Sequence, residues 1–145
     1  MPNPLSVLII GCGNIAGGYD EAGNDKAIRS HAGAYRNDDR FRVVACIDPN
    51  EDRRRQFMTR WEVPAGFSDL AACRAAAGAF DVASVCVPTA YHEAVLRELL
   101  DMPLRAVLAE KPLTGDVAQS QQIVDAYRVA GRPLAVNFLR RFDPV

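Results

Sequence analysis

The fold is decided by one stretch near the start of the chain, Leu5-Ser6-Val7-Leu8-Ile9-Ile10-Gly11-Cys12-Gly13-Asn14-Ile15-Ala16. An apolar run too short to cross a membrane leads directly into the pattern G-x-G-x-x-A, which is typical of the strand-to-helix turn that holds a dinucleotide pyrophosphate. Gly11 permits the tight turn, and Gly13 lets the backbone approach phosphate oxygens. Ala16 must only be small enough for helix and strand to pack. The N–H groups of the first helical turn, which includes Asn14 and Ile15, would face the anion.

Length and composition exclude several classes of protein. A chain of 145 residues is the size of about one domain, and 49% hydrophobic with 24% charged residues is ordinary for a globular protein. The net charge of −1 argues against a nucleic-acid binder. The basic run Arg53-Arg54-Arg55 is interpreted as the solvated face of a helix. No apolar stretch approaches the ~20 residues of a membrane helix, and the first residues do not resemble a signal peptide.

The cysteines and histidines indicate neither disulfides nor a metal site. Four cysteines are present, at positions 12, 46, 73 and 86, without C-x-x-C spacing. Three of them lie in or beside expected core strands, which favours reduced, buried thiols in a cytoplasmic protein. His31 and His92 are the only histidines, and no cluster of metal ligands accompanies them.

Short apolar runs alternate with helical patterns along the chain. We expect strands at residues 5–10, 42–47, 81–87, 105–109 and 134–138, with a brief extended piece at 65–67, and helices at 50–61, 89–100 and 116–130. Several strands are continuously apolar, which suits a parallel sheet covered on both faces. The sequence therefore predicts an α/β fold: a doubly wound, mostly parallel Rossmann-type sheet with helices on both faces, forming one dinucleotide-binding domain over residues 1–145.

One segment departs from the usual spacing. An acidic residue is expected about 20 residues after the glycines, but the candidate Asp48 lies 32 positions after Ala16. Residues 17–25 contain the excess. Because two adjacent glycines are poor helix formers, the first helix should be a single turn, with a second short helix resuming near Ser30 and carrying His31 and Tyr35. The insertion is either a tolerated surface loop or a loop beside the cofactor or substrate cleft.

Asp48 follows the second apolar strand. A carboxylate there can accept hydrogen bonds from the adenosine ribose hydroxyls and would repel a 2′-phosphate, which favours NAD over NADP. The nearby Arg53 keeps NADP open. The alternative is that Asp48 caps the helix that starts near Asn50.

Two later strand ends carry further candidates. Pro88 and Thr89 follow the strand at 81–87, where a ligand of an open parallel sheet would bind. Thr89 can touch a cofactor or, as the simpler interpretation, cap the next helix. His92 lies one turn into that helix, where it either packs or lines the cleft.

Glu110-Lys111-Pro112 is the strongest chemical group, at the end of the strand 105–109. A lysine that is partly buried at a strand end has an adjustable pKa and can donate to a substrate oxygen. Glu110 could orient it or contact the nicotinamide side. The alternative is a surface ion pair.

Together these motifs resemble the glucose–fructose oxidoreductase, inositol dehydrogenase and MocA family. The resemblance is carried by G-C-G-N-I-A, Asp48, Val87-Pro88-Thr89 with His92, and Glu110-Lys111-Pro112. The segment 137–142 is also similar to the one where that family's first domain passes to its second. The resemblance implies NAD(P)-dependent hydride transfer on a sugar, polyol or related hydroxy compound.

The resemblance also implies roles for single residues. Lys111 would be the catalytic lysine that polarises the reacting oxygen, and Asn137 and Arg141 would border the substrate cleft with it. The cofactor-binding residues would be Gly11, Gly13, Asn14, Ile15, Ala16, Asp48, Pro88, Thr89, His92 and Glu110. The family's second domain, which carries substrate contacts and the dimerising sheet, is expected to be absent from this chain. The 145-residue piece alone is therefore expected to be inactive, with a homo-oligomeric parent protein.

Two other functions remain open from the sequence. A non-catalytic NAD(P)-binding sensor or interaction module could use the same glycine turn. A methyltransferase with a similar turn is disfavoured by Glu110-Lys111-Pro112.

Overall fold

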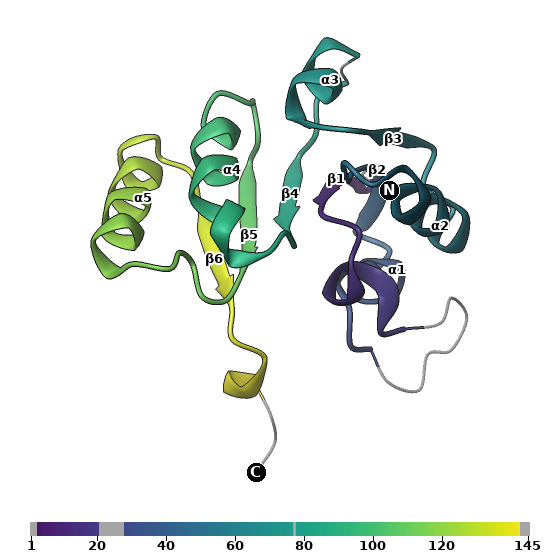
Figure 1. The fold of residues 1–145 in the computed structure, drawn as a ribbon, viewed down its shortest axis with the longest axis horizontal. Coiled ribbons are helices and arrows are strands. Elements are labelled where there is room, and N and C mark those ends of the chain that lie inside the picture. The colour runs from purple at the N-terminus through teal and green to yellow at the C-terminus, as the bar shows by residue number, and fades with distance from the viewer. Residues whose placement is uncertain (1–2, 21–27, 77, 143–145) are drawn as a thin grey trace.

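A single parallel sheet organises the chain, as seen in a computed structural model that describes residues 3–20, 28–76 and 78–142 (Figure 1). Its strands are β1 (Leu5–Ile10), β2 (Phe41–Ile47), β3 (Ala65–Phe67), β4 (Val82–Val85), β5 (Ala106–Glu110) and β6 (Leu134–Asn137). They lie in the order β3-β2-β1-β4-β5-β6, and every described pair is parallel. This is the strand order of dinucleotide-binding domains, with its reversal between β1 and β4.

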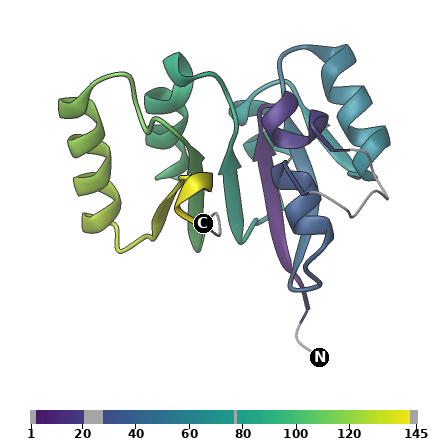
Figure 2. The same ribbon diagram turned by 90° about the horizontal axis from the view of Figure 1, so that it is seen from below.

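Helices cover both faces of the sheet (Figure 2). They are α1 (His31–Arg36), α2 (Glu51–Trp61), α3 (Leu70–Ala75), α4 (His92–Leu99) and α5 (Val117–Val129), with short turns η1 (Asn14–Gly18), η2 (Thr89–Tyr91) and η3 (Leu139–Phe142). One buried cluster joins the sheet to α3, α4 and α5, and a second joins it to η1, α1 and α2. Burial on both sides explains the continuously apolar strands, since Val7, Leu8 and Ile9 are all fully covered.

The predicted fold class is confirmed, and the sheet is entirely parallel across the described strands. The piece at 65–67 is a strand, but β4 is shorter than the predicted 81–87. Helix α3 was not predicted. It has only six residues and begins after Asp69, whose side chain caps it by accepting from the Ala72 amide at 2.7 Å. None of the helices in the described ranges is long and apolar enough to cross a bilayer.

The connection from β1 to β2 has the single first helical turn that the adjacent glycines predict. The helix after the glycine turn is one π-type turn of five residues, and α1 begins after Ser30, whose hydroxyl accepts from the Gly33 amide at 3.2 Å. Asp20 and Ser30 hold the two ends of the intervening segment together through a 2.6 Å hydrogen bond. Residues 21–25 of the predicted insertion at 17–25 lie outside the described residues.

The basic run on α2 largely has the predicted environment. Arg53 and Arg55 are exposed, whereas Arg54 is half-buried and donates to the Asp48 carbonyl at 2.6 Å.

All four cysteines are buried and free.

Candidate active site

The glycine turn meets the packing requirements that its sequence implies. Gly11 has φ +90°, and a Cβ there would lie 2.8 Å from the Cys86 carbonyl carbon and oxygen. A Cβ at Gly13 would have nothing within 4 Å, so the backbone there is open to an approaching group. Ala16 is fully buried in the cluster with Phe57 and Trp61. The turn therefore provides bare backbone where a pyrophosphate would lie, followed by the unpaired N–H groups with which any helix begins.

Asp48 ties this turn to the start of α2. Its Oδ2 accepts from the Cys12 amide at 2.9 Å, and its Oδ1 accepts from the Asn50 amide at 2.9 Å. Arg53 approaches Oδ2 with an N–O separation of 3.4 Å. The cap of α2 is Asn50, which accepts from the Arg53 amide, so the alternative that Asp48 caps this helix is wrong. Asp48 is buried, yet a carboxylate has about four acceptor positions, and one remains for a further donor.

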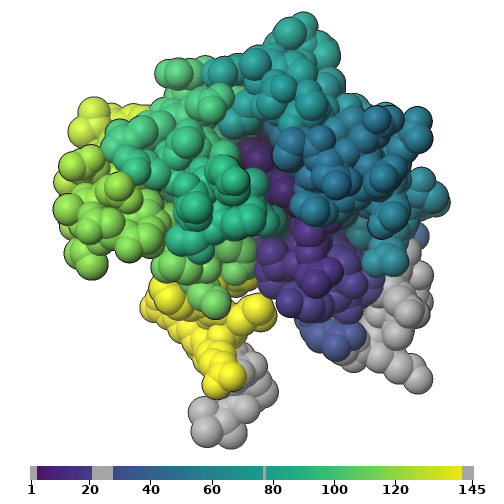
Figure 3. Space-filling view, viewed as in Figure 1, coloured from purple at the N-terminus to yellow at the C-terminus, as the bar shows by residue number. Residues whose placement is uncertain are grey.

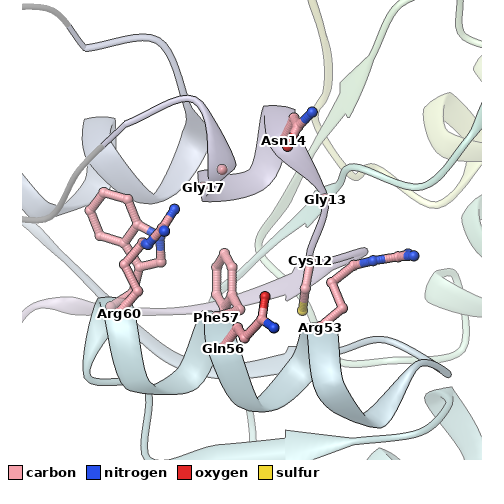
Figure 4. Close-up of a pocket in the computed structure, with 10 residues that line it drawn as sticks. Cys12, Gly13, Asn14, Gly17, Arg53, Gln56, Phe57 and Arg60 are labelled. Carbon is pink, nitrogen blue, oxygen red and sulfur yellow. The ribbon is translucent and has the colours of Figure 1, made fainter.

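A cavity of about 380 Å³ lies between the glycine turn and α2 (Figure 4). The side chains of Arg53, Gln56, Phe57 and Arg60 rise from α2 toward η1, and Gly13 and Asn14 form part of the opposite wall. Figure 3 shows the purple N-terminal segment at the floor of a hollow between the blue surface of α2 and the green surface of α4. Two guanidinium groups and exposed backbone give this cavity the chemistry to hold an anionic nucleotide.

The residues after β4 divide into accessible and structural ones. Pro88 is exposed and Thr89 is half-buried at the start of η2. Neither η2 nor α4 has a side-chain cap, so the expectation that Thr89 caps the helix is wrong. The reason is that η2 intervenes and moves the start of α4 to His92.

His92 is buried, with Nε2 2.8 Å from the Val87 carbonyl oxygen and Nδ1 3.1 Å from that of Leu113. Both ring nitrogens face the backbone, so His92 packs between the loops after β4 and β5. A direct contact of His92 with a cofactor would require breaking these interactions.

Glu110, the last residue of β5, lies beside Asn137, the last residue of β6. Asn137 donates to Glu110 Oε1 at 2.6 Å, and His31 Nε2 lies 2.8 Å from the same oxygen. Burial raises the pKa of Glu110, but the hydrogen bonds from His31 and Asn137 outweigh burial and hold it below its ordinary value. Glu110 is thus a buried carboxylate that α1 and β6 fix in place.

Lys111 differs from the expectation of partial burial, because its side chain is exposed. β5 ends at Glu110, so Lys111 is the first residue beyond the sheet. Among the described residues, Glu110 is hydrogen-bonded to His31 and makes no ion pair with Lys111, so the surface ion pair of the sequence alternative is wrong. Arg141 is exposed on η3, whereas Asn137 is half-buried.

Sequence reasoning missed the role of His31. The sequence placed it on the second short helix but gave it no function, because its partner Glu110 is 79 residues away. The signal that could have found it is its position: His31 is the first residue of the helix that returns from the carboxyl end of β1, and Glu110 ends β5 at the same edge of the parallel sheet.

Fold and site together define a dinucleotide-binding Rossmann domain. A family model described as an oxidoreductase family with an NAD-binding Rossmann fold matches residues 5–138. The chain therefore belongs to the glucose–fructose oxidoreductase, inositol dehydrogenase and MocA family, as its motifs predicted.

Relatives and solved structures agree with this assignment. Inositol 2-dehydrogenase of Corynebacterium glutamicum (strain ATCC 13032) is 31% identical over 145 residues, which are 99% of this chain and 39% of that protein. A 3-ketoreductase from Actinomadura kijaniata, solved with NADP and TDP-benzene, matches with a TM-score of 0.79 and 26% identity, over 98% of this chain and 39% of its own. An Agrobacterium radiobacter oxidoreductase, solved with NAD⁺, L-tartaric acid and magnesium, shares the fold, with a TM-score of 0.74 and 21% identity over 92% and 35% of the two chains. The chain spans between 35% and 39% of the length of these proteins.

Proposed function

We propose that this chain is the cofactor-binding part of an NAD(P)-dependent dehydrogenase that acts on a hydroxyl or carbonyl group of a sugar, polyol or related compound. The observation that carries the proposal is that the bare glycine turn, Asp48 and Glu110-Lys111 lie at the carboxyl ends of β1, β2 and β5 in one parallel sheet. Ligands of such sheets bind at this edge. Family membership and the similarity to an inositol 2-dehydrogenase and to a 3-ketoreductase support the same class of substrate.

Each residue has a defined task in this proposal. Gly11 keeps the turn tight. The pyrophosphate is then held by the backbone N–H groups of Gly13, Asn14, Ile15 and Ala16. Asp48 accepts from the ribose, and Pro88 and Thr89 flank the cofactor. When bound, NAD(P) supplies the carbon that accepts or gives the hydride.

Lys111 is the proposed catalytic residue. Its exposed ammonium can donate to the reacting oxygen or, as the amine, take the hydroxyl proton while the hydride leaves. Asn137 and Arg141 are proposed to border the substrate cleft with Lys111. A cytoplasmic location, supported by the four free buried cysteines, and a homo-oligomeric parent protein belong to this proposal.

The coenzyme is proposed to be NAD in preference to NADP. Asp48 is buried beside the glycine turn, where its charge would repel a 2′-phosphate. Arg53 partly compensates that charge, and Arg60 lines the same cavity, so the preference should be moderate.

Titration of the 145-residue chain with NADH, followed by nicotinamide fluorescence, tests the binding part of the proposal. We expect weak but saturable binding and no turnover by this piece. Absence of NADH binding would refute the proposal. Lys111→Ala in the longer protein separates an enzyme from a sensor: an enzyme loses turnover and retains cofactor affinity, whereas a sensor retains its response.

A further inference from the structure

A chain of buried polar groups lies on the face of the sheet that α1 covers. Ser84 of β4 and Glu110 of β5 come from neighbouring strands, and Asn137 of β6 is the register partner of Glu110 on the next strand. His31 and Tyr35, one helical turn apart on α1, contact these groups from above. Buried polar side chains of this kind are retained only when their hydrogen bonds are made.

The hydrogen bonds that connect these buried polar groups can all be donated in the direction of the Glu110 carboxylate. A carboxylate only accepts, so His31 Nε2 donates to Glu110 Oε1 at 2.8 Å, and in the tautomer with its proton on Nε2 the other ring nitrogen, Nδ1, is an acceptor. The Ser84 hydroxyl, 3.3 Å away, can fill that position. Burial raises the pKa of Tyr35, which keeps its phenol protonated and able to donate to Ser84 at 2.8 Å.

The second donor completes the arrangement at the carboxylate. Asn137 Nδ2 donates to the same Oε1 at 2.6 Å, so one oxygen of Glu110 receives both bonds. A buried carboxylate held by two donors from two elements has little freedom to rotate. Lys111 is the next residue along the backbone, and it lies just beyond the carboxyl end of β5.

We infer that His31 is a positioning residue for the Glu110-Lys111 pair: with Asn137 it holds the Glu110 carboxylate inward and thereby sets the place of Lys111 at the proposed nicotinamide end of the site. His31 contacts neither substrate nor cofactor in this role. The inference rests on the proposed function only in taking the ligand at this end of the site to be the nicotinamide of NAD(P).

Binding measurements on the 145-residue chain can separate the two ends of the site. The variants are His31→Leu, which removes the donor, and His31→Gln, which retains an amide donor of similar reach. Tyr127→Phe is the control, since it removes a buried hydrogen bond to the Leu96 carbonyl within the other buried cluster. NADH reports on the whole site, and ADP reports on the glycine turn without the nicotinamide.

We expect His31→Leu to weaken NADH binding about 10-fold, the lower limit for loss of one hydrogen bond to a charged group, and to leave ADP binding within about twofold of wild type. His31→Gln should restore NADH affinity, and Tyr127→Phe should change neither. Equal weakening of NADH and ADP, or no rescue by glutamine, would overturn the inference. If His31→Leu does not fold, Asn137→Ala carries the same expectation at a half-buried position.

A second readout does not depend on the cofactor. The sequence has two lysines, Lys26 and Lys111, so reductive methylation with ¹³C-formaldehyde labels them and the terminal amine alone, and Lys26→Arg assigns the signals. We expect the Lys111 signal to move in His31→Leu and to return in His31→Gln. If wild type does not bind NADH, the proposed function fails, and the Lys111 signal alone decides the inference: an unmoved signal refutes it.

Discussion

Replacement of Gly11 by alanine tests whether the glycine turn is shaped by its contact with the loop after β4. The new Cβ would lie 2.8 Å from the Cys86 carbonyl and 2.9 Å from the Val87 nitrogen, both backbone atoms, at φ +90°. The backbone strain costs about 1–3 kcal/mol, and overfilling a packed site costs about 1–3 kcal/mol. The sum of roughly 2–6 kcal/mol is a large part of the 5–15 kcal/mol that stabilises a typical domain.

Urea unfolding measures this loss directly. The single tryptophan, Trp61, is 8% exposed and reports on unfolding by its fluorescence. With about 1–3 kcal/mol per molar urea, Gly11→Ala should lower the midpoint by about 1 M or more, or prevent folding.

Gly13→Ala is the matched control. Its φ is −80° and its Cβ would meet nothing within 4 Å, so stability should stay equal to wild type or rise by about 0.4–1 kcal/mol. The same methyl group should abolish NADH binding, because it occupies the space proposed for the pyrophosphate. Equal stability of the two alanine variants would refute the reasoning about Gly11.

Three further predictions concern single side chains. Asp48→Asn should weaken NADH binding about tenfold through loss of charge-assisted hydrogen bonds, and it should raise the affinity for NADPH relative to that for NADH. An unchanged ratio of the two dissociation constants argues against the ribose contact. Burial raises the pKa of Asp20, but bonds from Ser30 and the Arg29 amide outweigh burial and lower it, so its contribution to stability is present above pH 3.8 and disappears as the pH falls through the lowered value. The difference in unfolding free energy between wild type and Asp20→Asn should therefore narrow in acid, and a pH-independent difference contradicts this. Tyr127→Phe should destabilise the chain by about 1 kcal/mol in urea unfolding, without an effect on NADH binding.

The fold could be predicted from local patterns because its elements are locally encoded. Apolar strands, Gly11 with Ala16, and the helix-breaking pair Gly17-Gly18 each act within a few residues, and the structure confirms the sheet and the single first turn. Short elements such as α3 give too few turns of periodicity to detect.

The site was less predictable because its contacts are distant in sequence. The pattern placed Glu110 beside Lys111, but its bonded partners are His31 and Asn137, 79 and 27 residues away. For Thr89 the sequence favoured a cap on the next helix over a cofactor contact, and a 3₁₀ turn occupies that position instead. Which strand ends share hydrogen bonds depends on strand order and register, and these are properties of the assembled sheet.

The central position of β1 has a consequence for synthesis of the chain. β1 pairs with β2 on one side and with β4 on the other, and Ile10 meets Val85 only after 75 further residues have been made. At about 5–20 residues per second, that interval lasts roughly 4–15 s. Throughout it, one edge of a strand whose residues 7–10 are later buried is unpaired, so the nascent chain is exposed to aggregation at β1 until β4 has been made.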